Sequence, residues 1–155
     1  MQAVREISVA AKLIYTHPIK SRNNITTAYL AYGIRTFVID SRSELLKLAD
    51  IVDLQVCEIM LRIKIPILSA SALQNLDEKF GVPPEEAGNL LRLIAKRGAR
   101  VGVCFHVGSQ QEFPDAHWAA IEFLSGLLKD IDVNICILSI GGLSLIHISE
   151  PTRPY

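Results

Sequence analysis

The chain has 155 residues, of which half are apolar and 21% charged, with 16 basic and 16 acidic side chains. This composition predicts one globular domain, or part of a larger one, and excludes a disordered chain. The net charge of zero argues against a nucleic-acid partner. No apolar run reaches the roughly 18 residues of a membrane span, and without a basic segment followed by an apolar one we expect no secretory signal. We therefore expect a cytoplasmic protein with no nucleic-acid or membrane partner.

Along the chain, short apolar segments alternate with longer segments of helical periodicity. Each apolar segment is nearly continuous in hydrophobic character, as expected for parallel strands buried on both faces. The predicted strands are residues 12–15, 36–39, 58–63, 101–105 and 135–140. The predicted helices are residues 24–32, 41–52, 83–98 and 114–129. This α/β order predicts parallel strands with right-handed crossovers, as in an open doubly wound sheet or a (β/α)8 barrel, and periodicity does not separate the two.

Local signals set the ends of these helices. Ser41 and Glu44 predict a capping box, in which each side chain binds an amide at the start of the helix. Pro84 predicts the beginning of the third helix and Gly98 its end. In the fourth helix, Trp118 is expected to face inward with the leucines that follow it.

The remaining features between the elements predict loops and buried thiols. Residues 64–76 are expected to form a long loop after the third strand, where such folds place function. Cys57, Cys104 and Cys136 are odd in number and far apart, so they fit neither a disulfide framework nor a metal site. We expect three buried thiols in a reducing compartment, and no metal.

The last residues break the alternation. The run LSLIHISEPTR at residues 143–153 resembles the conceptual translation of a sequencing adapter. We therefore expect residues 1–142 to be a fragment of one barrel domain and residues 143–155 to be a non-native tail. His147, Glu150 and Arg153 receive no functional role.

Chemically active residues fall where predicted strands end. His106 and Ser109 follow the fourth strand, Gly141 and Gly142 follow the fifth, and Arg62 lies within the third. The carboxyl ends of parallel strands form the ligand edge of such folds. There a His can stack on a flat ring, a Ser can bind phosphate and paired glycines can present amides to an anion. Plainer interpretations stay open, namely a His capped by carbonyls, a tight turn and an Arg that reaches water.

Four segments together resemble a known family. They are MLRI (60–63), EKFGV (78–82), FHVGSQ (105–110) and LSIGG (138–142). In this order they resemble the alanine-racemase-like barrel of the PLP-dependent basic amino-acid decarboxylases. The segment YTHPIKS (15–21) is similar to its ornithine decarboxylase branch. The resemblance covers about residues 2–142 and implies a partial (β/α)8 barrel containing the family's third to seventh strands.

The resemblance also implies a cofactor and the residues that hold it. The cofactor is pyridoxal 5'-phosphate (PLP). His106 matches the His that stacks on the pyridine ring, and Ser109 matches a phosphate ligand. Gly141 and Gly142 match the first two glycines of the phosphate loop, and Arg62 matches an Arg beside the cofactor.

Other family features are changed or fall outside the sequence. Lys79 matches a Lys near the interface of a homodimer, in which the partner chain completes the active site. The family's Schiff-base lysine lies on an earlier strand, so we predict no catalytic residue in this chain and no activity. Lys12, Lys20 and Lys64 do not stand in its motif and are expected to be solvated. Ser139 stands where the family usually has Asp.

The function implied is that of a fragment of a PLP-dependent decarboxylase for a basic amino acid in polyamine biosynthesis. Ornithine is favoured, with lysine and diaminopimelate as alternatives. Two alternatives stay open, a non-catalytic homologue that binds the decarboxylase's partner proteins and an amino-acid racemase on the same barrel. The regulator predicts loss of the cofactor ligands, whereas His106 and Ser109 are present. The racemase needs a Tyr from a second domain that is not in view.

Overall fold

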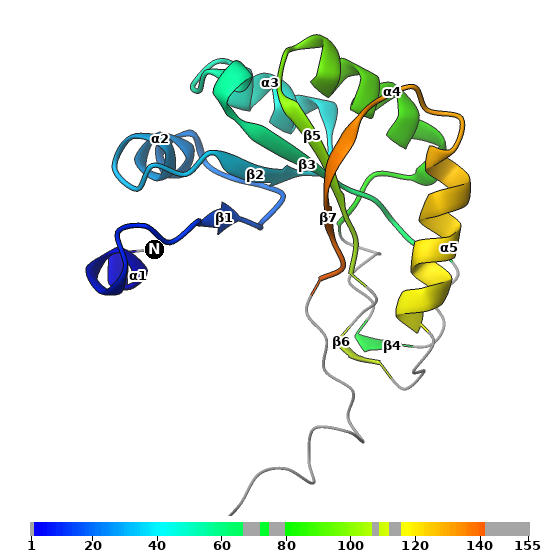
Figure 1. The fold of residues 1–155 in the computed structure, drawn as a ribbon. Coiled ribbons are helices and arrows are strands. Elements are labelled where there is room, and N and C mark those ends of the chain that lie inside the picture. The colour runs from blue at the N-terminus through cyan, green and yellow to red at the C-terminus, as the bar shows by residue number, and fades with distance from the viewer. Residues whose placement is uncertain (1, 67–71, 75–79, 107–108, 112–115, 142–155) are drawn as a thin grey trace, which may run out of the picture.

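The structure is a computed structural model that describes residues 2–66, 72–74, 80–106, 109–111 and 116–141. Its centre is a five-stranded parallel sheet in the order β1-β2-β3-β5-β7 (Figure 1). The strands are Ile14–Tyr15 (β1), Thr36–Ile39 (β2), Glu58–Arg62 (β3), Arg100–Cys104 (β5) and Ile135–Ser139 (β7). The helices are Gln2–Ile7 (α1), Arg22–Leu30 (α2), Arg42–Ala49 (α3), Pro84–Lys96 (α4) and Ala116–Leu128 (α5), with a 3₁₀ turn at Leu54–Val56.

The strand order separates the two architectures that the sequence left open. Each strand pairs with the preceding strand of the same sheet, without the reversal that defines a doubly wound sheet. In Figure 1, α2 to α5 follow one another around the outside of the curved sheet. The prediction of a partial (β/α)8 barrel with five parallel strands is therefore confirmed.

The two faces of the sheet have different cores. Phe37 and Ile59 belong to a large cluster that also contains buried residues of the helices, such as Leu45 and Leu91. On the other face, Val38, Met60 and Cys104 form a small cluster against Ile137, without helical residues. Successive residues of a strand point to opposite faces of the sheet. The large cluster therefore lies between the sheet and the helices, and the small cluster lies on the face that points into the barrel.

The predicted helix ends are partly correct. The Oγ of Ser41 accepts a hydrogen bond from the amide of Glu44 at 3.4 Å, as a capping box requires. The second contact of the box, from the Ser41 amide to the Glu44 carboxylate, was predicted wrongly. That carboxylate pairs with Lys20 and Lys47 instead. Helix α4 begins at Pro84 as predicted.

Two predictions of burial are wrong. Trp118 is 64% exposed, because Ala120 and Leu124 form the buried stripe of α5 and a residue two positions from Ala120 lies on the far side of a helix. All three cysteines are free thiols, and Cys57 and Cys104 are buried as predicted. Cys136 is exposed, because it lies on the edge strand β7. Its thiol donates a hydrogen bond to the Val101 carbonyl at 3.2 Å.

Part of the predicted loop at 64–76 is a strand. Residues Ala72–Gln74 (β4) pair antiparallel with Ser109–Gln111 (β6) to form a separate two-stranded sheet. The predicted non-native tail at 143–155 lies outside the described residues. No helix in the described part of the chain is long and apolar enough to cross a membrane.

A group of charged residues joins the strands at their amino ends. Thr36, Glu58 and Arg100 lie in register on three neighbouring strands. The buried Glu58 carboxylate accepts a hydrogen bond from Thr36 Oγ1 at 2.7 Å and pairs with Lys12 Nζ at 2.7 Å and Arg100 Nη1 at 2.8 Å. Burial alone would raise the pKa of Glu58, but the hydrogen bonds from Lys12 and Thr36 and the two cations hold it below its ordinary value.

Replacing Glu58 by Gln is expected to lower the free energy of unfolding at pH 7 by about 1–2 kcal/mol. A carboxyl whose pKa is lowered on folding stabilises the fold above its unfolded pKa, about 4.3, and loses that contribution as the pH falls through the folded pKa. The difference between wild type and E58Q should therefore disappear in acid. Denaturant titrations at pH 7 and pH 3 measure it, with the exposed Glu85→Gln as control. A difference of equal size at both pH values would contradict this account.

Candidate functional site

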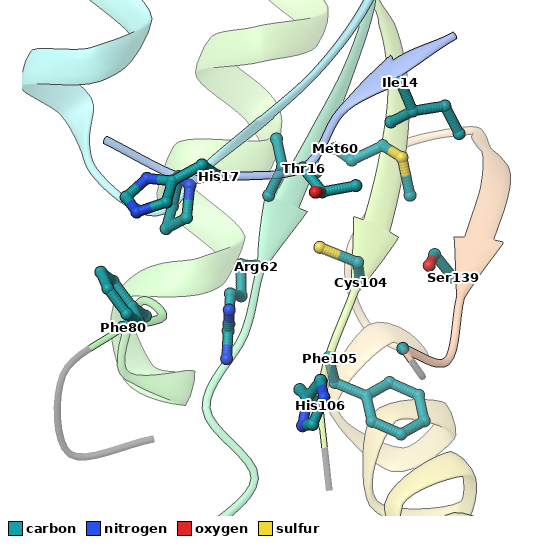
Figure 2. A pocket seen from close by; sticks show the side chains of 13 residues that line it. Ile14, Thr16, His17, Met60, Arg62, Phe80, Cys104, Phe105, His106 and Ser139 are labelled. Atoms are coloured by element: carbon teal, nitrogen blue, oxygen red, sulfur yellow. The ribbon is translucent and has the colours of Figure 1, made fainter. Parts of the chain in front are cut away.

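A cavity of about 410 Å³ opens at the carboxyl ends of the parallel strands (Figure 2). This is the edge at which barrels of this kind bind their ligands. Its walls are mainly apolar, with a few polar side chains directed into it. The lining residues are Ile14, Thr16, His17, Pro18, Val38, Met60, Arg62, Phe80, Cys104, Phe105, His106, Ser139 and Gly141.

Arg62, the last residue of β3, brings a positive charge into this apolar cavity. Its Nε and Nη2 atoms are buried and have no hydrogen-bond partner among the described residues. Its guanidinium lies over the ring of Phe80, 5.5 Å from the centroid. A buried donor without a partner costs free energy, so these atoms are placed to receive an acceptor from a ligand.

His106 follows β5 and lines the same cavity. Burial lowers the pKa of its imidazole below the ordinary value, and the charges of Arg62 and His117 lower it further. The ring is therefore neutral at pH 7. A neutral ring at this edge can stack on a flat ligand without adding to the positive charge of Arg62.

Gly141 closes the cavity at the end of β7. Its φ is +78°, and an added Cβ would lie 2.8 Å from the carbonyl oxygen of Phe105 and 3.2 Å from the ring of His106. Just before it, the Phe105 amide donates to the Ser139 carbonyl at 3.1 Å. Glycine therefore allows the backbone after β7 to pass against His106. Ser139, where the resembled family usually has Asp, also lines the cavity.

His17 and Phe80 form a wall that sequence reasoning missed. Their rings meet edge to face, with centroids 5.5 Å apart. The Nδ1 of His17 accepts a hydrogen bond from the Ile19 amide at 3.2 Å, which sets the orientation of the ring. Both residues lie in segments, 15–21 and 78–82, that resemble the decarboxylase family, and that was the available signal.

The structure thus brings Arg62, His106 and Gly141 together around one cavity. The other predicted site residues, Lys79 and Gly142, lie outside the described residues, as does the side chain of Ser109.

The lysines differ from expectation in one case. Lys12 has a side chain that is 66% exposed, as predicted, and Lys64 is half-buried. The prediction for Lys20 is wrong, because it is only 3% exposed. No lysine of the described residues lines the cavity.

The cysteines do not add a nucleophile to the cavity. Burial raises the pKa of the Cys104 thiol, which lines it, to about 12, so the thiol stays protonated at neutral pH. The described residues hold no group of three or more His, Cys, Asp or Glu side chains placed to bind a metal ion.

Comparison with known proteins gives a consistent result. The family model described as "Pyridoxal-dependent decarboxylase, pyridoxal binding domain" matches residues 1–150. The lysine/ornithine decarboxylase of Selenomonas ruminantium is 32% identical over 147 residues, which cover 92% of this chain and 36% of the relative. The ornithine decarboxylase of Panagrellus redivivus is 33% identical over 136 residues, covering 84% and 30%.

Solved structures agree with these relatives. The crystal structure of an SrLDC mutant in complex with PLP is similar with a TM-score of 0.77 and 29% identity, covering 94% of this chain and 38% of the other. The arginine decarboxylase of Paramecium bursaria Chlorella virus, bound to agmatine, has a TM-score of 0.75 and 27% identity, covering 90% and 39%. The chain therefore spans between 30% and 39% of the length of these four proteins.

Proposed function

Because this chain belongs to the pyridoxal-dependent decarboxylases, of which it carries the pyridoxal-binding domain, we propose that Arg62, His106 and Gly141 hold PLP in a protein that decarboxylates a basic amino acid. The observation that carries this proposal is the pair of buried donor atoms of Arg62 that find no acceptor among the described residues and lie inside an apolar cavity. Such a site suits a flat, largely apolar ring that bears anionic or hydrogen-bond-accepting substituents.

The residues present fit PLP in three respects. Val38, Met60 and Phe105 supply apolar walls for the ring. Arg62 supplies donors for an oxygen substituent. Gly141 leaves room at the end of β7, where barrels commonly bind phosphate after their seventh and eighth strands.

Each of these residues has a separate task in the proposed site. PLP supplies the electron sink that decarboxylation requires. His106 stacks on the ring as a neutral imidazole, since its lowered pKa keeps it uncharged. Arg62 orients the ring through its Nε and Nη2 donors. The apolar walls exclude water, which strengthens the contacts of Arg62 with a bound anion. Ser109 and Gly142 are proposed to bind the phosphate, and Lys79 is proposed to lie at the interface of a homodimer.

The finer assignments rest on the segment at 15–21 and on the names of the relatives. We favour ornithine as substrate, lysine or diaminopimelate as the alternatives, and polyamine synthesis in the cytoplasm as the setting. No lysine of the described residues lines the cavity. The proposal is therefore that this 155-residue chain binds PLP without anchoring it covalently and is inactive by itself, residues 143–155 being a non-native tail.

Titration calorimetry with PLP tests the proposed function. The chain is expected to bind PLP saturably at one site and to bind pyridoxal, which lacks the phosphate, more weakly. The chain should release no carbon dioxide from ornithine. The parent protein should release it, and faster from ornithine than from lysine or arginine. Equal affinity for PLP and pyridoxal would contradict the proposed binding of the phosphate group. Stereo-inversion by the parent, without release of carbon dioxide, would establish the racemase instead.

A further inference from the structure

Lys20 is a buried cation beside the cavity that does not itself line it. It lies in residues 16–21, the segment that connects β1 to α2. Its side chain is 0% exposed. Burial lowers the pKa of Lys20 to about 8, and the Glu44 carboxylate opposes this shift. Lys20 therefore remains an ammonium group at pH 7 and keeps all of its donors.

The ammonium group is matched by backbone acceptors. Lys20 Nζ donates to the carbonyl oxygens of Val38 at 2.6 Å, Pro18 at 2.8 Å and His17 at 3.1 Å. An ammonium has three donors, so these contacts satisfy it. Two of the acceptors belong to the segment that contains Lys20, and the third belongs to β2. The side chain thus ties this segment to the carboxyl end of β2.

Neighbouring elements hold the same group in place. The carboxylate of Glu44, on α3, lies 3.6 Å from Lys20 Nζ and also pairs with Lys47. Lys47 Nζ in turn donates to the carbonyl oxygen of Lys20 at 2.7 Å. The ring of Tyr15, at the end of β1, lies with its centroid 5.7 Å from Lys20 Nζ.

The three residues whose carbonyls Lys20 holds are also residues of the cavity wall. His17, Pro18 and Val38 all line the cavity, and the ring of His17 packs against that of Phe80, which also lines it. We propose that Lys20 is a positioning residue for the cofactor cavity, fixing the His17–Pro18 wall against β2 through its ammonium group. This inference rests on the proposed function only for the identity of the cofactor.

The test replaces Lys20 by Met, which keeps most of the length of the side chain and removes the ammonium group. Amide hydrogen exchange in residues 16–21 should become faster, while exchange in β3 and β5 should not change. PLP affinity should fall by about tenfold, because the wall against which the cofactor binds is no longer fixed. The matched control is Lys96→Met, an exposed lysine in the last turn of α4; it should change neither reading.

Three results would overturn the proposal. They are unchanged exchange at residues 16–21 in K20M, an equal loss of protection throughout the sheet, and unchanged PLP affinity. If K20M does not fold, exchange in the wild-type chain decides. The Ile19 amide, which donates to His17 Nδ1, must then exchange more slowly than the amides of the exposed helix α1, and equal rates would refute the tie. Absence of PLP binding in the wild type would refute the proposed function alone, because exchange still reports whether Lys20 holds the wall.

Discussion

Replacing Arg62 by Met is expected to weaken PLP binding by roughly 10- to 150-fold, which corresponds to the loss of about 1.5–3 kcal/mol from hydrogen bonds to a charged group. The free energy of unfolding without ligand should not fall with it. Nε and Nη2 of Arg62 are buried and have no partner in the part of the chain that the structure describes, so removing them relieves a cost. The contact with Phe80, worth about 0.5–1 kcal/mol, is lost in exchange. Affinity and stability should therefore separate in this variant.

Calorimetric titration and denaturant unfolding measure the two quantities on the same sample. A third reading follows from the charge of Arg62, which lowers the pKa of His106. In R62M the pKa of His106 should rise toward its ordinary value, as followed by NMR of the imidazole. The exposed Arg92→Met is the control for loss of a guanidinium elsewhere. Parallel losses of PLP affinity and of stability would show that Arg62 stabilises the fold and does not bind the cofactor directly.

Replacing Gly141 by Ala is expected to disrupt the same site through the backbone. Alanine at a φ of +78° is strained, and its Cβ would stand 2.8 Å from the Phe105 carbonyl oxygen. Strain of this kind costs about 1–3 kcal/mol. The end of β7 can avoid it only by moving away from β5, which breaks the bond from the Phe105 amide to Ser139 and displaces His106. We expect both lower stability and a fall in PLP affinity of roughly 10- to 100-fold.

Gly126→Ala is the matched control for this substitution. Gly126 is exposed in α5, and an added Cβ there would meet no atom within 4 Å. Alanine in a helix interior is favoured over glycine by about 1 kcal/mol, so G126A should raise stability and leave PLP affinity unchanged. Calorimetry and thermal unfolding compare the two variants. If G141A behaves like G126A, the close approach of β7 to His106 has no functional importance.

The core strands were predictable because each is a continuous apolar segment whose burial depends on its own sequence. Strand β2 occurs at Thr36–Ile39, as predicted. The small sheet of β4 and β6 could not be predicted, since each strand has three residues and exists only through pairing across 35 positions of chain. A sheet of this kind leaves no local periodicity.

The site shows the same division. Arg62, His106 and Gly141 were found because they stand at or after the ends of apolar strands, where parallel folds gather their ligands. Lys20 does not stand in the motif of the Schiff-base lysine, so the sequence predicts a solvated side chain. One of its partners, the Val38 carbonyl, lies 18 residues away and becomes visible only in the fold.

Strand β3 carries Glu58 at its first residue and Arg62 at its last, so the charged group at the amino ends and the cavity are separated by roughly 13 Å. Substitutions that far apart usually have additive effects. Over evolutionary time, changes that adapt the cavity to a different ligand can therefore accumulate without loosening the ion pairs at the opposite edge. The same separation suits directed evolution. Random variation at the carboxyl ends of the strands would change which ligands bind, while the unchanged amino ends would preserve the stability that lets the fold tolerate mutation.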